Sequence, residues 1–325
     1  LLSSIEFTGE FENQVYSALT ENDGGKNIAG MLANANKDEI IYCPISLSNA
    51  AEFEVEIPSS IIKIAAHAFD SFEESKTPAL KKYNPVTKVT FNGNLAAIGD
   101  YAFYKSRNLT EVTFKAVADP VGMTIGDYAF YRCNKLNVVT FEEEGAWSTT
   151  DSNIFEATKS CGVKSIGAHA FDSASITELK LPYSLNTLGE YAFATATALK
   201  SIDLATVSPI LTFGDYAFSM CRSLTAVELT KNVGTMNFNL VFYECTKLEL
   251  TVSPDNPNYT VGEGGVLYNK DVTEIIYYPD SFEGVYELPE SVTKISGAVF
   301  KGKNSMTSIV ISKNMVEIGD SAFED

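Results

Sequence analysis

Apolar and polar residues alternate along the chain in a phrase that recurs. Residues 98–103 read IGDYAF, which is an apolar anchor, a glycine, an acid, an aromatic ring, an alanine and a phenylalanine. Residues 125–130 repeat this phrase, and looser copies continue to Ala322 and Phe323. A fixed phrase that recurs in this way marks a solenoid, whose units lack a core of their own and bury one only by stacking. The pattern therefore predicts a repeat solenoid.

A second apolar pattern, Leu-x-x-Val-x-Phe, lies between the copies of this phrase. It occurs at residues 109–114, 136–141, 176–181, 199–204, 224–229 and 306–311. Its last two apolar residues are two positions apart, so they face one side of an extended segment while the residue between them faces the other. This alternation predicts one short strand per coil, parallel to the strands of neighbouring coils.

The phenylalanine that ends the phrase sets the length of one coil. The steps from Phe171 to Phe242 are 22, 25 and 24 residues, and the step from Phe300 to Phe323 is 23 residues. Two steps are much longer, at 41 residues from Phe130 to Phe171 and 58 residues from Phe242 to Phe300. We expect the extra residues to form divergent coils, at residues 142–165 and 246–289.

Each coil is expected to run as strand, corner, second short strand, glycine bend and one helical turn that carries Ala-Phe. Proline suits the corner because it fixes φ and need not donate to a ladder. The glycine, as at Gly99, either adopts positive φ or lets neighbouring backbones approach closely. The acid after it, as at Asp100, is expected to cap the helical turn. The phenylalanine rings should then stack along the axis.

The sequences IGDYAFYRC followed by LNVVTF, and IGDYAFYKS followed by LTEVTF, carry a family resemblance over residues 46–325. They look like the BspA-like leucine-rich repeats of bacterial surface and secreted proteins of the Bacteroides type. Residues 256–279 are similar to that family's variant coil, in which two strands flank an Asn-Lys-Asp turn, and the alternation itself suggests a hairpin there. The resemblance implies a right-handed, β-rich leucine-rich-repeat array and an exported, cell-surface role such as adhesion.

Residues 1–45 depart from the repeat and are expected to form a small N-terminal cap, because the first coil of a solenoid exposes its core unless something covers it. Residues 5–9 suggest a strand, and residues 14–19 and 28–35 suggest two helical pieces. The chain begins at Leu1. We therefore expect that a signal peptide has been removed and that the protein is secreted or cell-surface.

Composition narrows the range of partners. The formal net charge is −18, from 42 acidic and 24 basic residues, which argues against nucleic acid and anionic lipid. No apolar stretch approaches the length of about 18 residues that predicts a membrane helix, so we expect no membrane insertion. Three of the five cysteines share one repeat position that other coils fill with Ser or Ala, so they are predicted to be small, buried core residues: Cys133, Cys221 and Cys245.

Candidate chemistry is sparse. The two histidines, His67 and His169, stand where other coils carry tyrosine, so each is interpreted as a packing residue without a general base or metal ligands around it. The acidic residues 142–144 lack the alternating oxygens of a calcium loop. The glycines at 262–265 lack a phosphate-binding context. We predict that the chain is not an enzyme and has no catalytic residue, cofactor or metal site.

Outward positions of the predicted strands remain as a binding surface, because solenoids commonly bind partners along one continuous face. Trp147, the only tryptophan, adds a candidate anchor in an inserted segment. The predicted surface comprises Glu111, Thr113, Thr140, Trp147, Glu178, Lys180, Asp203 and Glu228. We expect a monomeric, adhesin-like protein that binds an extracellular protein or glycan. The alternative is a structural spacer that presents other modules at the cell envelope.

Overall fold

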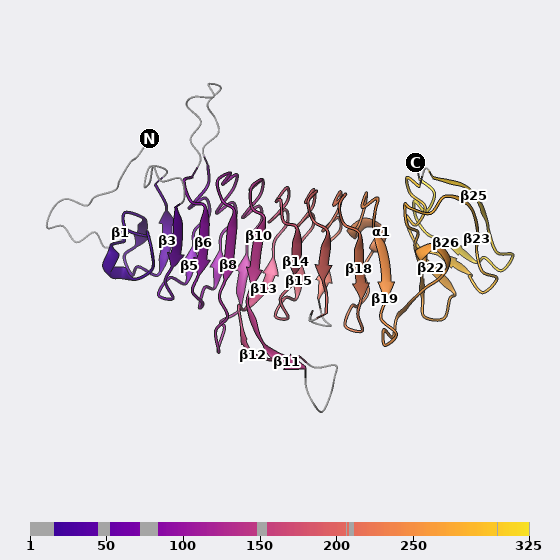
Figure 1. The fold of residues 1–325 in the computed structure, drawn as a ribbon, viewed down its shortest axis with the longest axis horizontal. Coiled ribbons are helices and arrows are strands. Elements are labelled where there is room, and N and C mark those ends of the chain that lie inside the picture. The colour runs from indigo at the N-terminus through magenta and orange to yellow at the C-terminus, as the bar shows by residue number, and fades with distance from the viewer. Residues whose placement is uncertain are drawn as a thin grey trace, which may run out of the picture.

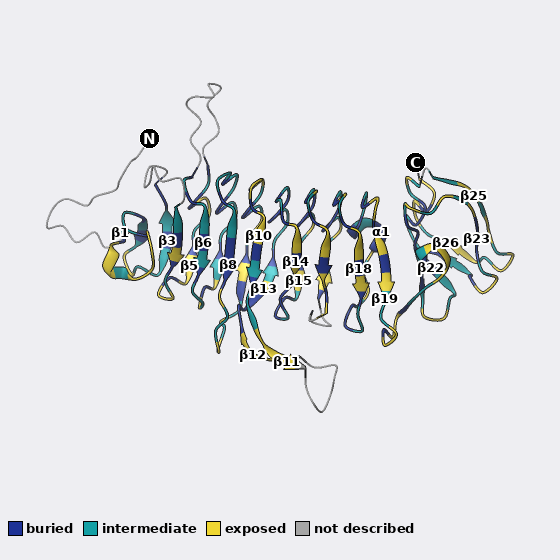
Figure 2. Cartoon of the chain, viewed as in Figure 1, coloured by how far each residue is buried: buried dark blue, intermediate teal, exposed yellow. Residues whose placement is uncertain are grey.

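The computed structural model describes residues 16–44, 53–71, 84–147, 155–205, 207, 211–303 and 305–324. These residues form a rod of stacked coils, with β1 near one end and β25 near the other (Figure 1). Apolar side chains fill the inside of the coils, and exposed residues lie on the outside (Figure 2). The predicted solenoid with short parallel strands is confirmed.

Strands with the x-Val-x-Phe type of alternation line one side of the rod. The first four form a parallel sheet: β4 (Glu54–Ile57), β6 (Lys88–Phe91), β8 (Glu111–Phe114) and β10 (Val138–Phe141). The next four form a second parallel sheet: β14 (Glu178–Lys180), β16 (Ser201–Asp203), β18 (Ala226–Leu229) and β19 (Glu249–Val252). We call the outward positions of these eight strands the strand face.

The opposite side of the coils is a nine-stranded sheet. Its parallel members are β3 (Glu39–Tyr42), β5 (Lys63–Ile64), β7 (Ala97–Ile98), β9 (Met123–Ile125), β13 (Val163–Ile166), β15 (Thr187–Leu188) and β17 (Thr212–Phe213). Two strands extend β3 in antiparallel fashion at the N-terminal end: β1 (Tyr16–Ala18) and β2 (Leu32–Asn34). A short 3-10 helix, η1 (Glu21–Asp23), lies between them.

The helices expected at 14–19 and 28–35 are therefore wrong where the structure describes them, because β1 and β2 occupy these segments. Short apolar runs suit either a helix or a strand, and pairing with the edge of the sheet decides the outcome here. The strand expected at residues 5–9 lies outside the described residues.

The predicted column of phenylalanine rings is confirmed inside the coils. Successive rings from Phe69 to Phe242 stack with centroids 4.5 to 5.9 Å apart. Phe103 and Phe130 in this column are fully buried. Parallel, closely spaced rings of this kind add specific aromatic contacts to the burial of apolar area. The column is thus a main contributor to cohesion between coils.

The turn that carries Ala-Phe differs from the expected helical turn. The residue before the alanine has a left-handed backbone, with φ of 58° at Tyr101 and 56° at Tyr128. The Tyr101 N–H donates to the carbonyl of Asp127 in the next coil, at 2.9 Å, and the Phe103 N–H donates to that of Ala129, at 2.7 Å. The turn therefore keeps local bonds three residues apart, as from the Ala102 N–H to the Gly99 carbonyl at 3.2 Å, and adds bonds between coils. Among the described residues, one four-residue α-helix is present, α1 (Phe238–Val241).

The glycine of the repeated phrase serves close approach rather than positive φ. A Cβ added at Gly99 would lie 2.5 Å from the backbone nitrogen of Ala66 in the preceding coil, and Gly99 has no positive φ. Asp100 also differs from the expected cap of its own turn. Its Oδ1 accepts from the Asp127 N–H of the next coil at 2.9 Å, and the Oδ1 of Asp127 accepts from Ala168 N–H at 2.7 Å.

Both long steps between phenylalanines contain inserted strands. In the first, β11 (Glu143–Trp147) and β12 (Phe155–Ser160) pair as an antiparallel hairpin that projects from the rod (Figure 1). In the second, β20 (Tyr259–Val261) and the 3-10 helix η3 (Glu263–Gly265) precede β21 (Leu267–Asn269) and β22 (Glu274–Tyr277). The pairing of β21 with β22 is antiparallel, which confirms the hairpin predicted around Asn-Lys-Asp.

The C-terminal coils form a second, smaller stack. β22 continues in parallel to β24 (Lys294–Ile295) and β26 (Glu317–Ile318), while β23 (Gly284–Glu287) pairs in parallel with β25 (Met306–Val310). Their core is separate from that of the N-terminal coils. Strands β21 and β22 contribute side chains to both cores, so they form the wall between the two stacks.

Candidate interaction surface

The structure brings seven of the eight predicted surface residues onto the strand face. Glu111 and Thr113 lie on β8, Thr140 on β10, Glu178 and Lys180 on β14, Asp203 on β16, and Glu228 on β18. Trp147 lies apart from them, at the end of β11 in the projecting hairpin. Its side chain is outside the described part of the structure. The strand register aligns outward residues in rows, as in the pairing of Lys180 with Asp203.

The N-terminal half of the strand face is occupied by its own cross-strand contacts. The ammonium of Lys88 lies 3.3 Å from a carboxylate oxygen of Glu54 and 3.6 Å from one of Glu111. Thr113 is in register with the threonines of both neighbouring strands and is only 9 % exposed. Opposite charges and paired threonines on adjacent strands stabilise a sheet. This half therefore presents few unsatisfied groups to a partner.

The C-terminal half carries exposed charges that remain available. Glu178, Lys180, Asp203 and Glu228 are all exposed. Within the described ranges, none of these four side chains takes part in an ion pair. Three carboxylates and one ammonium therefore face solvent side by side on β14, β16 and β18.

A groove separates the two halves of the strand face. β10 and β14 are the neighbouring edges of the two sheets, and no strand pairing joins them in the described structure. Ser175 still donates its N–H to the carbonyl of Leu136 at 2.9 Å, after which the two strands separate. The resulting hollow has a volume of about 440 Å³. Its lining comprises residues 137–141, residues 177–180, Ser201 and Asp203.

The inserted hairpin β11–β12 lies at the same place in the chain as this groove. It interrupts the coil between β10 and β13, so β14 is the first strand of a new sheet and not the fifth of the old one. The sequence signal for the groove was the 41-residue step between Phe130 and Phe171. The step predicted an insertion, but not that the strand ladder would open beside it.

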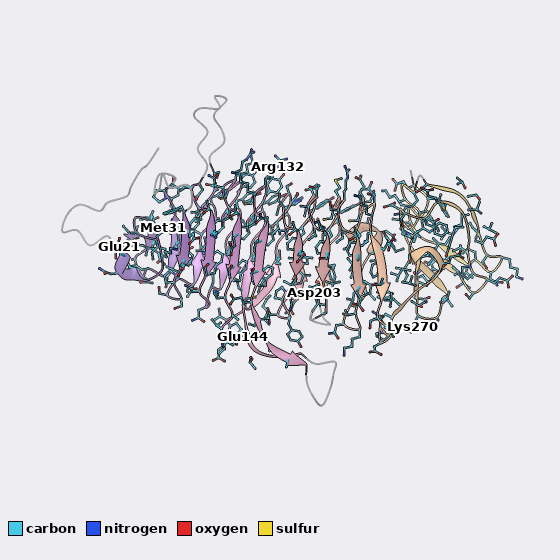
Figure 3. All side chains as sticks on the ribbon, viewed as in Figure 1. Glu21, Met31, Arg132, Glu144, Asp203 and Lys270 are labelled. Atoms are coloured by element: carbon cyan, nitrogen blue, oxygen red, sulfur yellow. The ribbon has the colours of Figure 1, made fainter. Side chains whose placement is uncertain are left out.

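A second exposed feature is the turn ridge, the row of turns that carry Ala-Phe. Six rings stack along it with centroids 4.7 to 5.1 Å apart: His67, Tyr101, Tyr128, His169, Tyr191 and Tyr216. The Nδ1 atoms of the two histidines lie 2.9 Å from Asp70 and Asp172. The prediction that each imidazole takes the packing place of a tyrosine is confirmed. Arg132 on this ridge and Glu144 on the hairpin lie on opposite sides of the rod (Figure 3).

The cysteines are buried and unpaired, which confirms the prediction for the three at the shared position. Each thiol of that position donates to the carbonyl of a phenylalanine in a preceding coil, as Cys133 does to Phe103 at 3.1 Å. Burial raises the pKa of the Cys43 and Cys161 thiols to about 12. The thiolate is the nucleophilic form of cysteine, and the raised pKa disfavours it at neutral pH.

Metal and membrane features can be stated for the described ranges only. There, no three His, Cys, Asp or Glu side chains are grouped so that they could hold a metal ion. The helices in those ranges are all too short or too polar to cross a bilayer.

Comparison with known proteins identifies the repeat. A family model described as "BspA type Leucine rich repeat region (6 copies)" matches residues 49–161, 164–285 and 270–325. A search of curated proteins found no significant match.

Two solved structures share the fold at low identity, and a third match is weaker. A leucine rich cell surface protein from Faecalibacterium prausnitzii is 20% identical, with a TM-score of 0.57 over 98% of this chain and 74% of that one. The pneumococcal vaccine antigen PcpA is 20% identical, with a TM-score of 0.55 over 96% and 66%. A leucine-rich repeat protein from Eubacterium ventriosum is 21% identical, with a TM-score of 0.45 over 83% and 58%. The chain thus spans less than two thirds of the last two proteins.

The family match covers both stacks of coils and most of the chain. The repeated phrase, the parallel strands and the axial phenylalanine column are the structural form of that repeat. The chain belongs to the BspA type leucine-rich-repeat family.

Proposed function

We propose that this chain is a non-enzymatic, exported surface protein that binds an extracellular protein through the C-terminal half of its strand face. The observation that carries the proposal is the groove between β10 and β14, with the exposed charges of Glu178, Lys180 and Asp203 along one wall. Leucine-rich arrays are scaffolds that serve binding more often than catalysis. Similar folds include a protein titled a cell surface protein and one titled a vaccine antigen, which supports an exported location.

The charge of the face indicates the chemistry of the partner. Glu178, Asp203 and Glu228 outnumber Lys180, and the whole chain carries a net charge of −18. A partner with a basic patch would be steered toward this surface, and its association would weaken as salt screens the charges. An extracellular protein with exposed lysine and arginine fits better than a neutral glycan.

Charge reversal on the strand face tests this proposal. Glu178→Lys with Asp203→Lys places two cations beside the groove, whereas Asp271→Lys with Glu287→Lys makes the same change at exposed positions of the C-terminal stack. Binding is measured by surface plasmon resonance against immobilised fibronectin, laminin and collagen at two salt concentrations. We expect salt-sensitive binding to at least one of them, lost in the first variant and kept in the second. Absence of binding to all three, or equal loss in both variants, would count against it.

The structural spacer remains the second candidate, and the rod shape favours it (Figure 1). A spacer needs length and cohesion between coils but no free surface. It predicts that charge reversal on the strand face changes no binding, and that stiffness of the rod is the property that matters. Small-angle scattering measures the length of the rod in solution. A stiff rod keeps its full length, whereas a flexible one is shorter on average.

A further inference from the structure

A pocket of about 410 Å³ lies where the two stacks of coils meet. It opens between the turn that follows Phe242 and the turn that follows Phe300, near the junction of α1 with the C-terminal stack. Its volume falls in the range of about 300–1,000 Å³ that is usual for small-molecule sites. The residues that matter for its chemistry are Arg222, Asn239, Tyr277, Asp280, Lys301 and Lys303.

The pocket exists because the phenylalanine column stops. Rings stack without a gap as far as Phe242, and the next stacked pair is Phe300 with Phe323. The inserted strands β20 to β22 follow in the chain, and among the described residues no ring stacks on Phe242 on that side. Asn239 on α1 bridges the junction instead, since its Nδ2 donates to the carbonyls of Ile276 at 2.7 Å and Gly297 at 3.1 Å.

Two residues that line the pocket each carry a buried polar atom without a hydrogen-bond partner in the described structure. The two hydrogen bonds of Nδ2 fix the side chain of Asn239, and its Oδ1 accepts no hydrogen bond from the described residues. The phenol oxygen of Tyr277 is likewise buried without a partner. Asn239 is 8 % exposed and Tyr277 is 1 % exposed. Buried polar atoms are normally satisfied, so a small movement of these side chains toward the pocket would let the hydroxyl groups of a ligand satisfy both atoms.

The rim of the pocket carries three cations, and each of them is paired with a carboxylate. Arg222 pairs with Glu244 at 2.7 Å, and Lys301 pairs with Glu324 at 2.9 Å. These pairs lie near the surface, where an ion pair contributes little and either carboxylate can be displaced. Lys303 is only 10 % exposed, and its ammonium lies 2.8 Å from Asp280 and over the ring of Tyr277.

We propose that this pocket binds an acidic saccharide. The carboxylate of the sugar would replace Glu244 and Glu324 as partner of Arg222 and Lys301, because a guanidinium binds a carboxylate in a planar, two-bond geometry. The hydroxyl groups would reach Asn239 and Asp280, which offer acceptor oxygens. This site lies away from the strand face, so the inference goes beyond the proposed function.

A matched pair of sugars tests the proposal. Galacturonate and galactose differ in the carboxylate at one carbon, and inorganic sulfate supplies an anion without hydroxyl groups. Binding is measured by isothermal titration calorimetry, and the site is located by chemical-shift changes of the backbone amides. We expect galacturonate to bind at least about tenfold more tightly than galactose or sulfate, because both charge and hydroxyl groups are recognised. The amides that shift should lie at residues 222, 239, 244 and 301–303.

Two variants on the turn ridge distinguish binding by the pocket rim from an effect of the overall charge of the ridge. Arg222→Gln with Lys301→Gln should weaken galacturonate binding about tenfold or more, while Arg132→Gln, which removes a cation from the same ridge outside the pocket, should leave it unchanged. The strand-face variant Glu178→Lys with Asp203→Lys should also bind galacturonate normally. The proposal is overturned by no saturable galacturonate binding up to about 10 mM, by equal binding of sulfate or galactose, or by equal loss in the Arg132 variant.

Discussion

The N-terminal and C-terminal stacks share one repeat but differ in how completely their coils cover one another. Seven phenylalanine rings stack continuously from Phe69 to Phe242, whereas the described part of the C-terminal stack has one stacked phenylalanine pair, Phe300 and Phe323. Phe103 is fully buried, while Phe323 is 42 % exposed. The stability that a phenylalanine of the repeat contributes therefore depends on whether a neighbouring ring packs on both of its sides. A coil within the stack has two such neighbours, and Phe323 stacks on one described ring.

The glycine position shows where one stack gives way to the next. Gly99, Gly126, Gly189 and Gly214 press against the backbone of the preceding coil. The next coil has Phe238 at this position, and there the chain forms α1 in place of the usual turn. The first coil after the break has Ser296, which has a Cβ. The glycine is therefore required by the coil that precedes it and is absent where the stacking changes.

The largest expected difference between the stacks comes from removing a ring of the column. Phe103→Ala leaves a cavity between two buried rings and should lower the free energy of unfolding by about 3–5 kcal/mol. Phe323→Ala removes a half-exposed ring and should cost less than about 1 kcal/mol. Urea unfolding followed by circular dichroism measures both. Equal losses would show that the column is no more cohesive in the first stack than at its end.

Next in size is a Cβ added at the glycine position. Gly99→Ala sets a methyl group 2.5 Å from backbone in the preceding coil, which cannot rotate away, so we expect a loss of about 1–3 kcal/mol. The control is Gly297, which stands in the place of Asp100 and not of Gly99: Gly297→Ala brings its methyl group no nearer than 3.2 Å, to the carbonyl oxygen of Asp320, and should cost under about 1 kcal/mol. Thermal unfolding of the two variants compares them. A neutral Gly99→Ala would mean that coils are less closely packed than described.

A smaller effect is expected from the acids that bond to the next coil. Asp127→Ala removes the acceptor of the Ala168 N–H and should cost about 1 kcal/mol. Asp320 stands in the last described turn and is exposed, so Asp320→Ala should lie within about 0.5 kcal/mol of the parent. Hydrogen exchange at Ala168 gives a local readout that a general loss of stability would not. Unchanged protection there would contradict the inter-coil bond.

The smallest effect expected is a pH dependence that differs between the stacks. Burial raises the pKa of Glu143, opposed by hydrogen bonds from Ser160 and Cys161. A carboxyl whose pKa is raised by folding contributes its full stability below the ordinary value of about 4.3 and loses it as pH rises through the folded value. The melting temperature should therefore fall as pH rises from that value toward neutrality. Glu143→Gln should flatten this slope, and an unchanged slope would refute the assignment.

The core of the C-terminal stack should respond to pH in the alkaline range. Its core holds tyrosines, and burial raises the pKa of Tyr278 to about 12. Tyr268 and Tyr286 share a hydrogen bond between their hydroxyl groups, and burial raises the pKa of Tyr268 further. Stability contributed by these neutral phenols is lost as pH rises above the ordinary value of about 10. Tyrosinate absorbance and the extent of unfolding are measured together as pH rises. They show which transition comes first, ionisation of the tyrosines or unfolding of the chain.

Much of the fold followed from residue patterns. The x-Val-x-Phe strands, the axial column and the hairpin at 267–277 were predictable because each depends on local alternation or on a repeated residue. The conformation of the turn before each phenylalanine was harder to predict from the sequence. Its left-handed residues include Tyr101 and Tyr191, a residue type that rarely adopts positive φ, and the bonds that fix them come from the next coil.

Less of the candidate surface could be predicted from residue patterns. Seven strand residues were placed on one face because alternation fixes which way each points. Their accessibility was not predictable, since Glu111 is paired with Lys88 while Glu178 faces an open groove. This difference in accessibility arises from neighbours in other coils. The N-terminal helices were wrong for the same reason, because β1 and β2 are set by pairing at the edge of the sheet.

The sequence by itself determined the unit of this protein: its length, its two strands, its glycine bend and the ring at its centre. These features repeat because every coil meets the same neighbours, so the pattern of one coil already describes its contacts. Tertiary structure alone decided where that regularity ends. The opening between β10 and β14 and the pocket between Phe242 and Phe300 depend on how inserted strands fill space between coils, and contacts between residues distant in sequence leave no periodic trace in the chain.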